Sequence, residues 1–138
     1  MKSKYNANKC NCDGYSFDSK LEMKYYEHLK ELKAKELIIN FELQPRYELI
    51  PKFESKGKKY RRIEYVGDFL IYRIDGSCSV IDIKGMATET AKLKRKLFEY
   101  KHRDDGLELN WIVWSGGQWL DYDEVIKARA KRKKAKSC

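Results

Sequence analysis

Apolar residues recur at steps of three and four positions in the first third of the chain, over residues 16–38. Tyr25, Leu29 and Leu32 fall on one face of a helix at that spacing, and Glu22 shares this face one turn earlier. The sequence therefore predicts an amphipathic helix with an acidic residue near its N-terminal end.

The middle of the chain changes to runs rich in Ile, Val, Tyr and Phe, separated by residues that favour turns. Strands are predicted at residues 47–53, 61–74, 78–85 and 107–115. A turn is predicted at residues 55–60. A helix is predicted over residues 88–102, with apolar positions at Leu93, Leu97 and Tyr100. Tight turns make the first three strands antiparallel neighbours, whereas a helix before the fourth strand permits a parallel crossover.

These elements predict one α/β domain with a mixed four-stranded β-sheet flanked by helices, in the order α-β-β-β-α-β-α. The last helix is predicted over residues 122–136. We assign residues 1–15 to a flexible N-terminal arm, 16–127 to the folded domain and 128–138 to a basic C-terminal tail. The length of 138 residues suits a single domain with a hydrophobic core.

The formal net charge of +9 indicates a polyanionic partner, of which nucleic acid is the first choice and an acidic membrane surface the second. No segment is apolar and long enough to span a bilayer, and the charged N-terminus is not followed by the hydrophobic segment of a secretory signal. We therefore expect a cytoplasmic protein. The four cysteines include no C-x-x-C pair, which favours free thiols over a zinc site.

The C-terminal segment KARAKRKKAKSC carries seven basic residues and no acidic residue. This composition fits a solubilising end. It also fits an arm that follows the phosphates of a nucleic acid and adds salt-sensitive affinity.

Charged residues interrupt the otherwise β-branched segment VIDIKG, residues 80–85. Side chains alternate between the two faces of a strand, so Asp82 and Lys84 share a face, while Ile81 and Ile83 point to the other. An unpaired charge at the edge of a core is costly. These two charges are therefore expected to meet each other, a metal ion or a ligand.

Asp68 lies in the preceding predicted strand and must face the same side of the sheet as this charged pair to act with it. A two-residue turn at residues 75–76 would place Asp68 opposite Ile83, on the wrong face. A three-residue loop at residues 75–77 places it opposite Lys84, and such loops with a left-handed glycine are common. A shared site therefore requires a loop of odd length.

The segment GDF, followed by DIK in the next strand, resembles the motif of the PD-(D/E)XK nuclease superfamily. Asp68 matches the first aspartate of that motif, and Asp82 and Lys84 match its second half. Glu22 matches a glutamate that many members carry on a preceding helix, whereas Gly67 stands where the motif has proline. The resemblance covers roughly residues 17–115 and implies a restriction-endonuclease-like core with the element order given above.

This resemblance implies a Mg²⁺-dependent DNA endonuclease in which Asp68, Asp82 and Glu22 hold the metal ion and Lys84 acts with them in catalysis. Mn²⁺ should substitute for Mg²⁺. The small size also resembles phage-encoded members, including Holliday-junction resolvases and end-nicking transposition nucleases. The implied substrate is then DNA, including branched DNA, in phage or mobile-element recombination or repair, and a homodimer would permit paired cuts.

Basic residues on two predicted helices are candidate phosphate contacts. The segment KRKLFEY is similar to the Q-x-x-x-Y segment of recombination nucleases, with Lys96 in place of glutamine. We assign the nucleic-acid-binding residues as Lys94, Lys96, Arg132, Lys133 and Lys134.

Structural roles without any chemistry remain open for two of the acids. Ser19 and Glu22 have the spacing of a capping box, in which the glutamate reaches back to the first residue of the helix. Asp68 is able to pair with Arg73 or Arg62 on a solvated strand face.

A structural role is open for the charged pair of the next strand as well, because Asp82 and Lys84 are able to form a salt bridge on an exposed face. The alternative function is accordingly a non-catalytic nucleic-acid-binding module on the same fold. All three acids and the lysine of the motif are retained, which favours the enzyme.

Overall fold

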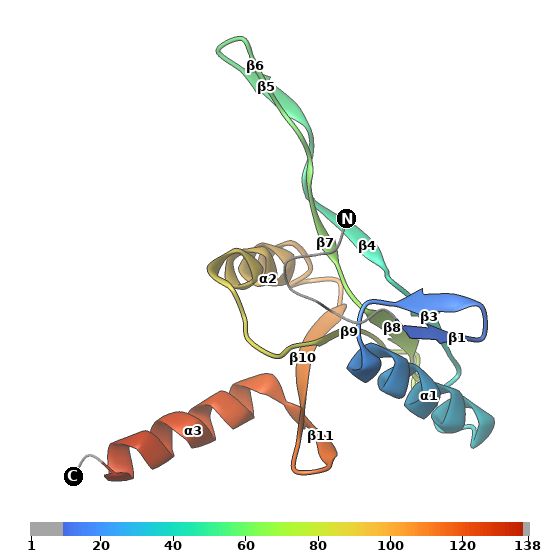
Figure 1. The fold of residues 1–138 in the computed structure, drawn as a ribbon. Helices are drawn as coiled ribbons and strands as arrows, with labels where there is room; N and C mark the ends of the chain where they lie inside the picture. The colour runs from blue at the N-terminus through green and yellow to red at the C-terminus, as the bar shows by residue number, and fades with distance from the viewer. Residues whose placement is uncertain (1–9, 137–138) are drawn as a thin grey trace.

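The computed structural model describes residues 10–136 of the chain. Its central sheet consists of β3 (Asn40–Leu43), β8 (Phe69–Tyr72), β9 (Cys78–Ile83), β10 (Glu108–Ser115) and β11 (Gln118–Asp121). These strands lie in the order β11-β10-β9-β8-β3, and only the pairing of β10 with β9 is parallel. The helices are α1 (Lys20–Ala34), α2 (Glu89–Lys101) and α3 (Tyr122–Lys136). The first two cover opposite faces of the sheet, and α3 extends away from it (Figure 1).

A long two-stranded ribbon leaves the sheet at the β3–β8 edge (Figure 1). Its proximal part pairs β4 (Arg46–Ile50) with β7 (Ile63–Val66), and its distal part pairs β5 (Phe53–Ser55) with β6 (Lys58–Tyr60). Strands β3 and β4 form one line that breaks at Gln44 and Pro45, and β7 and β8 form another that breaks at Gly67 and Asp68. The two breaks face each other, because Gly67 N–H donates to the Pro45 carbonyl at 3.0 Å.

The predicted apolar face of α1 is confirmed. Tyr25 and Leu29 are buried, and the ring of Tyr25 lies 5.3 Å from that of Phe69 in the sheet. Ser19 caps the N-terminus of the helix, and its side chain accepts a hydrogen bond from the backbone N–H of Glu22 at 3.1 Å. This cap fixes where the helix starts and therefore where Glu22 lies relative to the sheet.

The predicted apolar face of α2 is wrong in part. Leu93 and Tyr100 are 57% and 68% exposed, whereas Phe98 is fully buried. Phe98 packs against Tyr65, with ring centroids 5.3 Å apart, and belongs to the same cluster as Val80 of β9. The large aromatic ring decides which face of the helix turns to the sheet, and the aliphatic spacing along the helix does not reveal this.

The loop between β8 and β9 has the odd length that a shared site requires. Arg73 N–H donates to the Ser77 carbonyl at 2.9 Å and closes a three-residue loop, in which Gly76 has a φ of 88°. The loop thus occupies residues 74–76, one position earlier than predicted. Continuing this register places Asp68 opposite Asp82, not opposite Lys84 as predicted.

The predicted class, a single α/β domain with a mixed sheet flanked by helices, is confirmed. The described sheet has five strands where four were predicted. Strand β11 is short and follows a glycine turn, and β3 was not predicted: it precedes the break at Pro45, whereas the predicted strand at residues 47–53 overlaps β4 and β5 of the ribbon. The predicted turn over residues 55–60 is two residues long, and β6 occupies its second half.

Both predicted terminal segments lie partly outside the described residues. The described part of the N-terminal arm begins with β1 (Cys10–Cys12), which pairs with β2 (Tyr15–Phe17). The described part of the C-terminal tail continues α3 to Lys136. Within residues 10–136, no helix combines the length and the apolar character needed to cross a bilayer.

Gly67 is required by close packing at the break before β8. A Cβ atom at this position would lie 2.4 Å from Cγ1 of Val80, a residue with no exposed surface. We expect Gly67→Ala to lower the free energy of unfolding by about 1–3 kcal/mol, as overpacking of a core does. Urea unfolding measures this change. The matched control is Gly85→Ala, because a Cβ there meets no atom within 4 Å; an equal loss in both variants would contradict the packing argument.

Candidate functional site

Asp68, in the break directly before β8, lies beside Asp82 of the neighbouring antiparallel strand β9. Asp68 N–H donates to the Ile81 carbonyl at 2.9 Å, and Oδ2 of Asp68 accepts a hydrogen bond from Ile83 N–H at 2.7 Å. The carboxylate thus takes the place of a backbone acceptor in the ladder, so its position is fixed by the sheet. Asp82 is 7% exposed. Val80, on the same face as Asp82, packs in the cluster under α2, whereas Ile81 and Ile83 pack under α1, as the alternation predicted.

A buried hydrogen-bond chain holds Asp82 from behind. Tyr65 O–H donates to Oδ2 of Asp82 at 2.6 Å, and the same phenolic oxygen accepts from Nε1–H of Trp111 at 2.8 Å. Burial and the neighbouring Asp82 raise the pKa of Tyr65, so the phenol is protonated at neutral pH and is able to donate to Asp82. Sequence reasoning missed both aromatic residues. The sequence could have pointed to them only through their positions: Tyr65 lies in the strand before Asp68, and Trp111 lies in the strand that pairs with that of Asp82.

Lys84 lies close to both the acid and the aromatic ring. Its Nζ atom is 3.1 Å from Oδ2 of Asp82 and 4.9 Å from the centroid of the Trp111 ring. The predicted salt bridge therefore exists, but the two side chains are only 19% and 10% exposed, so it does not lie on an exposed face as that explanation required. The guanidinium of Arg95 contacts the same ring at 4.5 Å.

The solvated pairing considered for Asp68 is not found. Arg62 pairs with Glu64, and Arg73 donates a hydrogen bond to Ser79. Asp68 instead faces other acids. Its pKa is raised, first by burial and then by the charges of Asp82 and Glu22, while the hydrogen bond from Ile83 N–H opposes the rise.

Glu22 combines a cap position with a place near the aspartates. Only half of the capping box is present: Ser19 caps the helix, whereas the Glu22 carboxylate accepts from the backbone at Asp18. Burial raises the pKa of Glu22, and the charges of Asp18 and Asp82 raise it further. Glu22 and Asp68 line one cavity of about 130 Å³.

The carboxylates do not form a finished ion cage. Among residues 10–136, no three Asp, Glu, His or Cys side chains are close enough together to hold a metal ion directly. Asp68 and Asp82 lie next to each other, and the charge of Glu22 affects them electrostatically without direct contact. The donors present still suit Mg²⁺, which binds one or two carboxylates and retains several water molecules.

Gln44 is a further residue at the site. Its backbone has a φ of 49°, a conformation that L residues seldom adopt, and its N–H donates to the Asp68 carbonyl at 2.9 Å. Its side chain lines the cavity that Glu22 and Asp68 share. Local strain of this kind gathers at functional sites. The sequence could indicate only that Gln44 precedes Pro45 and a sheet.

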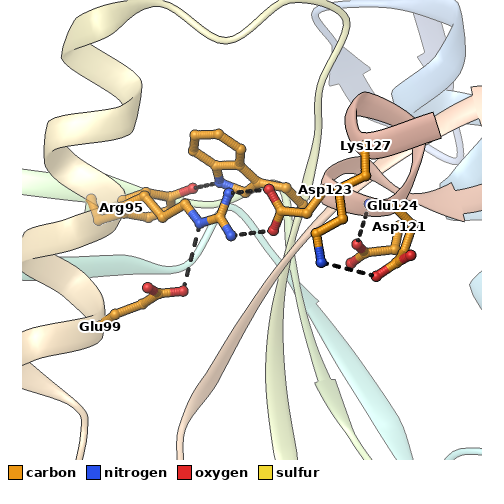
Figure 2. A network of polar contacts seen from close by, with 8 residues as sticks. Arg95, Glu99, Asp121, Asp123, Glu124 and Lys127 are labelled. Carbon is orange, nitrogen blue, oxygen red and sulfur yellow. Dashed lines mark hydrogen bonds and ion pairs between the residues drawn. The ribbon is translucent and has the colours of Figure 1, made fainter. Parts of the chain in front are cut away.

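The two lysines predicted on α2 flank a residue with a different role. Lys94 is half-buried and Lys96 is exposed, and neither has a contact that identifies it as a phosphate ligand. Arg95 between them is bound to Asp123 at 3.1 Å through Nη1, with a second bond from Nη2 (Figure 2). It also lies 3.6 Å from Glu99. Arg95 therefore joins α2 to the start of α3.

The sequence matches one family, described as "Protein of unknown function (DUF1064)", over residues 2–118. The chain belongs to the DUF1064 family. No curated protein matches the sequence. The match to DUF1064 includes all four residues of the candidate active site and ends before α3.

The first turn of helix α3 of this DUF1064 protein is fixed by two polar contacts. Asp121 caps it by accepting from Glu124 N–H at 3.0 Å, and Asp123 receives the guanidinium of Arg95 (Figure 2). No side chain of α3 is buried. The three predicted phosphate contacts on this helix are exposed; they are Arg132, Lys133 and Lys134.

Proposed function

We propose that this DUF1064 protein is a Mg²⁺-dependent DNA endonuclease that hydrolyses phosphodiester bonds in phage or mobile-element recombination or repair. One observation carries the proposal: the half-buried Asp68, directly before β8, lies opposite the buried Asp82 of β9, and a lysine bonds Asp82. Two carboxylates held close together and largely out of water destabilise each other unless a proton or a cation lies between them. A fold with no use for a cation has no reason to retain that arrangement.

The order of the elements supports assignment to the PD-(D/E)XK superfamily. Counting each interrupted strand as one, the chain runs from α1 through β3–β4, β7–β8 and β9 to α2, β10 and α3. This agrees with the restriction-endonuclease-like core that the motif implies, with β11 as an addition at one edge.

Asp68 and Asp82 are the residues that would hold Mg²⁺, with Glu22 as the third acid of the proposed metal set. A bound Mg²⁺ supplies an activated water and neutralises charge on the scissile phosphate. Burial and the nearby negative charges raise the pKa of Asp68. A bound cation would offset both effects by stabilising the ionised carboxylate.

The remaining side chains position the reaction. The ammonium of Lys84, held by Asp82 and the face of Trp111, donates hydrogen bonds toward the phosphate and stabilises the charge that develops there. Tyr65 fixes the orientation of Asp82 with a bond of 2.6 Å. Tyr65 and Trp111 are both buried. Asp82 and Lys84, which they contact, therefore require little rearrangement when DNA binds.

One observation favours the alternative, a nucleic-acid-binding module without chemistry: the described residues offer no three-donor ion cage. The two functions separate in a plasmid-nicking assay with Mg²⁺ and with EDTA. A nuclease nicks only with Mg²⁺. Binding without nicking at any Mg²⁺ or Mn²⁺ concentration supports the module. Comparison of four-way junction, flap, single-stranded and duplex DNA then identifies the substrate.

Removing the C-terminal part of α3 is expected to weaken DNA binding without changing the chemistry. Truncation after Ala128 deletes six basic residues: Arg129, Lys131, Arg132, Lys133, Lys134 and Lys136. The capping residue Asp121 and the Arg95–Asp123 pair remain, so the domain should fold. Each lost phosphate contact lowers the slope of log affinity against log salt by about 0.9. Fluorescence anisotropy over a salt series measures the slope, and an unchanged slope would show that the helix does not touch the phosphates.

A further inference from the structure

The end of the two-stranded ribbon has no role in the core. We use the term distal ribbon for residues 51–62, which comprise β5, β6, their turn and the two residues on either side. Every residue from Pro51 to Ile63 is exposed. In Figure 1 this segment extends far beyond the sheet and the three helices. An isolated hairpin that buries nothing adds little stability, so its presence requires another reason.

The distal ribbon is strongly basic. It carries six basic residues and one acidic residue, Glu54. The basic residues are Lys52, Lys56, Lys58, Lys59, Arg61 and Arg62. Arg62 pairs with Glu64, but in the described part of the chain no carboxylate comes within ion-pair distance of Lys52, Lys59 or Arg61. A concentration of uncompensated charge on a protruding element favours a polyanionic partner.

The two faces of the distal ribbon differ. Phe53 and Tyr60 are register partners on one face, and their rings stack with centroids 4.7 Å apart and planes at 8°. The opposite face carries Lys52, Lys59 and Arg61 by alternation along the strands, together with Glu54, the register partner of Lys59. The stacked pair joins the two strands on one face, so the ribbon presents three basic residues and one acidic residue on the other.

The turn makes the ribbon narrow. Its two residues, Lys56 and Gly57, have φ values of 51° and 77°. This is the pattern of a type I′ turn, whose twist matches that of the flanking strands. A two-stranded ribbon of this kind fits the major groove of B-form DNA, which is about 12 Å wide. The major groove of double-stranded RNA is too deep and narrow for it.

The distal ribbon is continuous with the strands of the candidate active site. Strand β6 leads through β7 and Gly67 to Asp68, and β5 leads back through β4 to Gln44. Six extended residues span about 20 Å, so the distal ribbon begins about 20 Å from Asp68 and ends about 40 Å from it. At ~3.4 Å per base pair, these distances correspond to roughly 6–12 base pairs.

We propose that the distal ribbon binds the major groove of duplex DNA, roughly 6–12 base pairs from the phosphate that Asp68 and Asp82 address. This inference rests on the function proposed above. It deepens that function by naming a double-stranded segment beside the cut as a required part of the substrate. Lys52, Lys59 and Arg61 contact phosphates along the groove, and Lys56 enters it first at the tip.

The first test compares two variants with equal loss of charge. Lys52→Gln/Lys59→Gln alters the ribbon, and Lys33→Gln/Lys35→Gln alters the far end of α1. Each is assayed by anisotropy with a 30-base-pair duplex in EDTA. We expect the ribbon variant to bind about 10-fold more weakly, with a log–log salt slope smaller by about 1.8, which is two contacts at about 0.9 each. The α1 variant should match the wild type. Because all four residues are surface lysines, both variants should keep the wild-type melting temperature.

The second test locates the groove. Methylation of guanine N7, which lies in the major groove, should interfere with binding of the wild type at positions roughly 6–12 base pairs from the cut. The ribbon variant should lose this interference. An equal fall in affinity for single-stranded DNA or double-stranded RNA would overturn the assignment to the DNA groove.

The two proposals fail in different ways. If the wild type nicks DNA with Mg²⁺ and the ribbon variant binds duplex with unchanged affinity and slope, the ribbon proposal is wrong and the nuclease stands. If binding depends on the ribbon but no metal supports nicking, the groove contact stands and the nuclease is wrong. A wild type that binds no duplex overturns the ribbon proposal, and the nicking assay with Mg²⁺ alone then decides whether the protein is a nuclease.

Discussion

Lys84→Ala is expected to lower the rate of DNA cleavage by roughly 10²–10³ while leaving the binding of metal and DNA nearly intact. The ammonium of Lys84 acts on the charge that develops on the phosphate, so its removal affects the transition state and not the ground state. Asp82 keeps its bond from Tyr65 in this variant, so the strand should remain in place. Loss of a cation 3.1 Å from Asp82 should make metal binding equal or tighter. Single-turnover cleavage at saturating DNA measures the effect on chemistry.

Two comparisons give this result its meaning. Lys35→Ala removes an exposed lysine that pairs with Glu31 on α1, and this variant should cleave like the wild type. Asp82→Ala should instead lose metal binding and activity together. Cleavage by Lys84→Ala at the wild-type rate would reduce Lys84 to a salt-bridge partner and favour the binding module.

Asp68→Asn is expected to stabilise the metal-free protein at pH 8 and to abolish cleavage. The folded-state pKa of Asp68 is raised, so its contribution to stability is fully present below the ordinary carboxyl range near pH 4 and is lost as the pH rises through the folded-state value. The amide oxygen of asparagine is still able to accept from Ile83 N–H without the charge. We expect a melting temperature higher by roughly 3–6 °C at pH 8, which corresponds to about 1 kcal/mol for a domain of this size.

Mg²⁺ should reverse the order of the two proteins. A ligand that binds only the folded state raises the melting temperature of the wild type in proportion to the logarithm of its concentration. Asp68→Asn, with one ligand fewer, should show little or no rise. Asp104→Asn is the matched control, because Asp104 is exposed and distant in the chain from the candidate site. If Mg²⁺ raises the melting temperatures of all three proteins equally, the ion is bound elsewhere.

The strand pattern allowed the central part of the site to be predicted. Alternation along residues 80–84 correctly separated Asp82 from Ile81 and Ile83, because a buried strand leaves no choice of face. The condition that the loop before β9 have an odd length was also met. Its position differed by one residue because Gly76, and not Ser77, ends the loop, and the partner of Asp68 changed from Lys84 to Asp82.

The rest of the site depends on contacts between distant segments. The phenol of Tyr65, on β7 of the ribbon, meets Asp82 on β9 of the central sheet, and Trp111 comes from a parallel strand beyond α2. The rotation of α2 was mispredicted for a related reason. Phe98 fills the space between Tyr65 and Val80, and no periodicity within the helix reveals that this space exists.

The turn at Lys56 and Gly57 also bears on how the chain reaches its native state. Leu43 and Phe69 are partners in the central sheet although a long stretch of chain separates them. Bringing such ends together in one step has a cost in chain entropy that grows with the length of the loop. A two-residue turn lets β5 and β6 pair first, and each further pair along β4 and β7 then closes only a small additional loop. The same ribbon thus gives the chain a local route by which β3 reaches β8, and folding can proceed from the tip of the hairpin inward to the sheet.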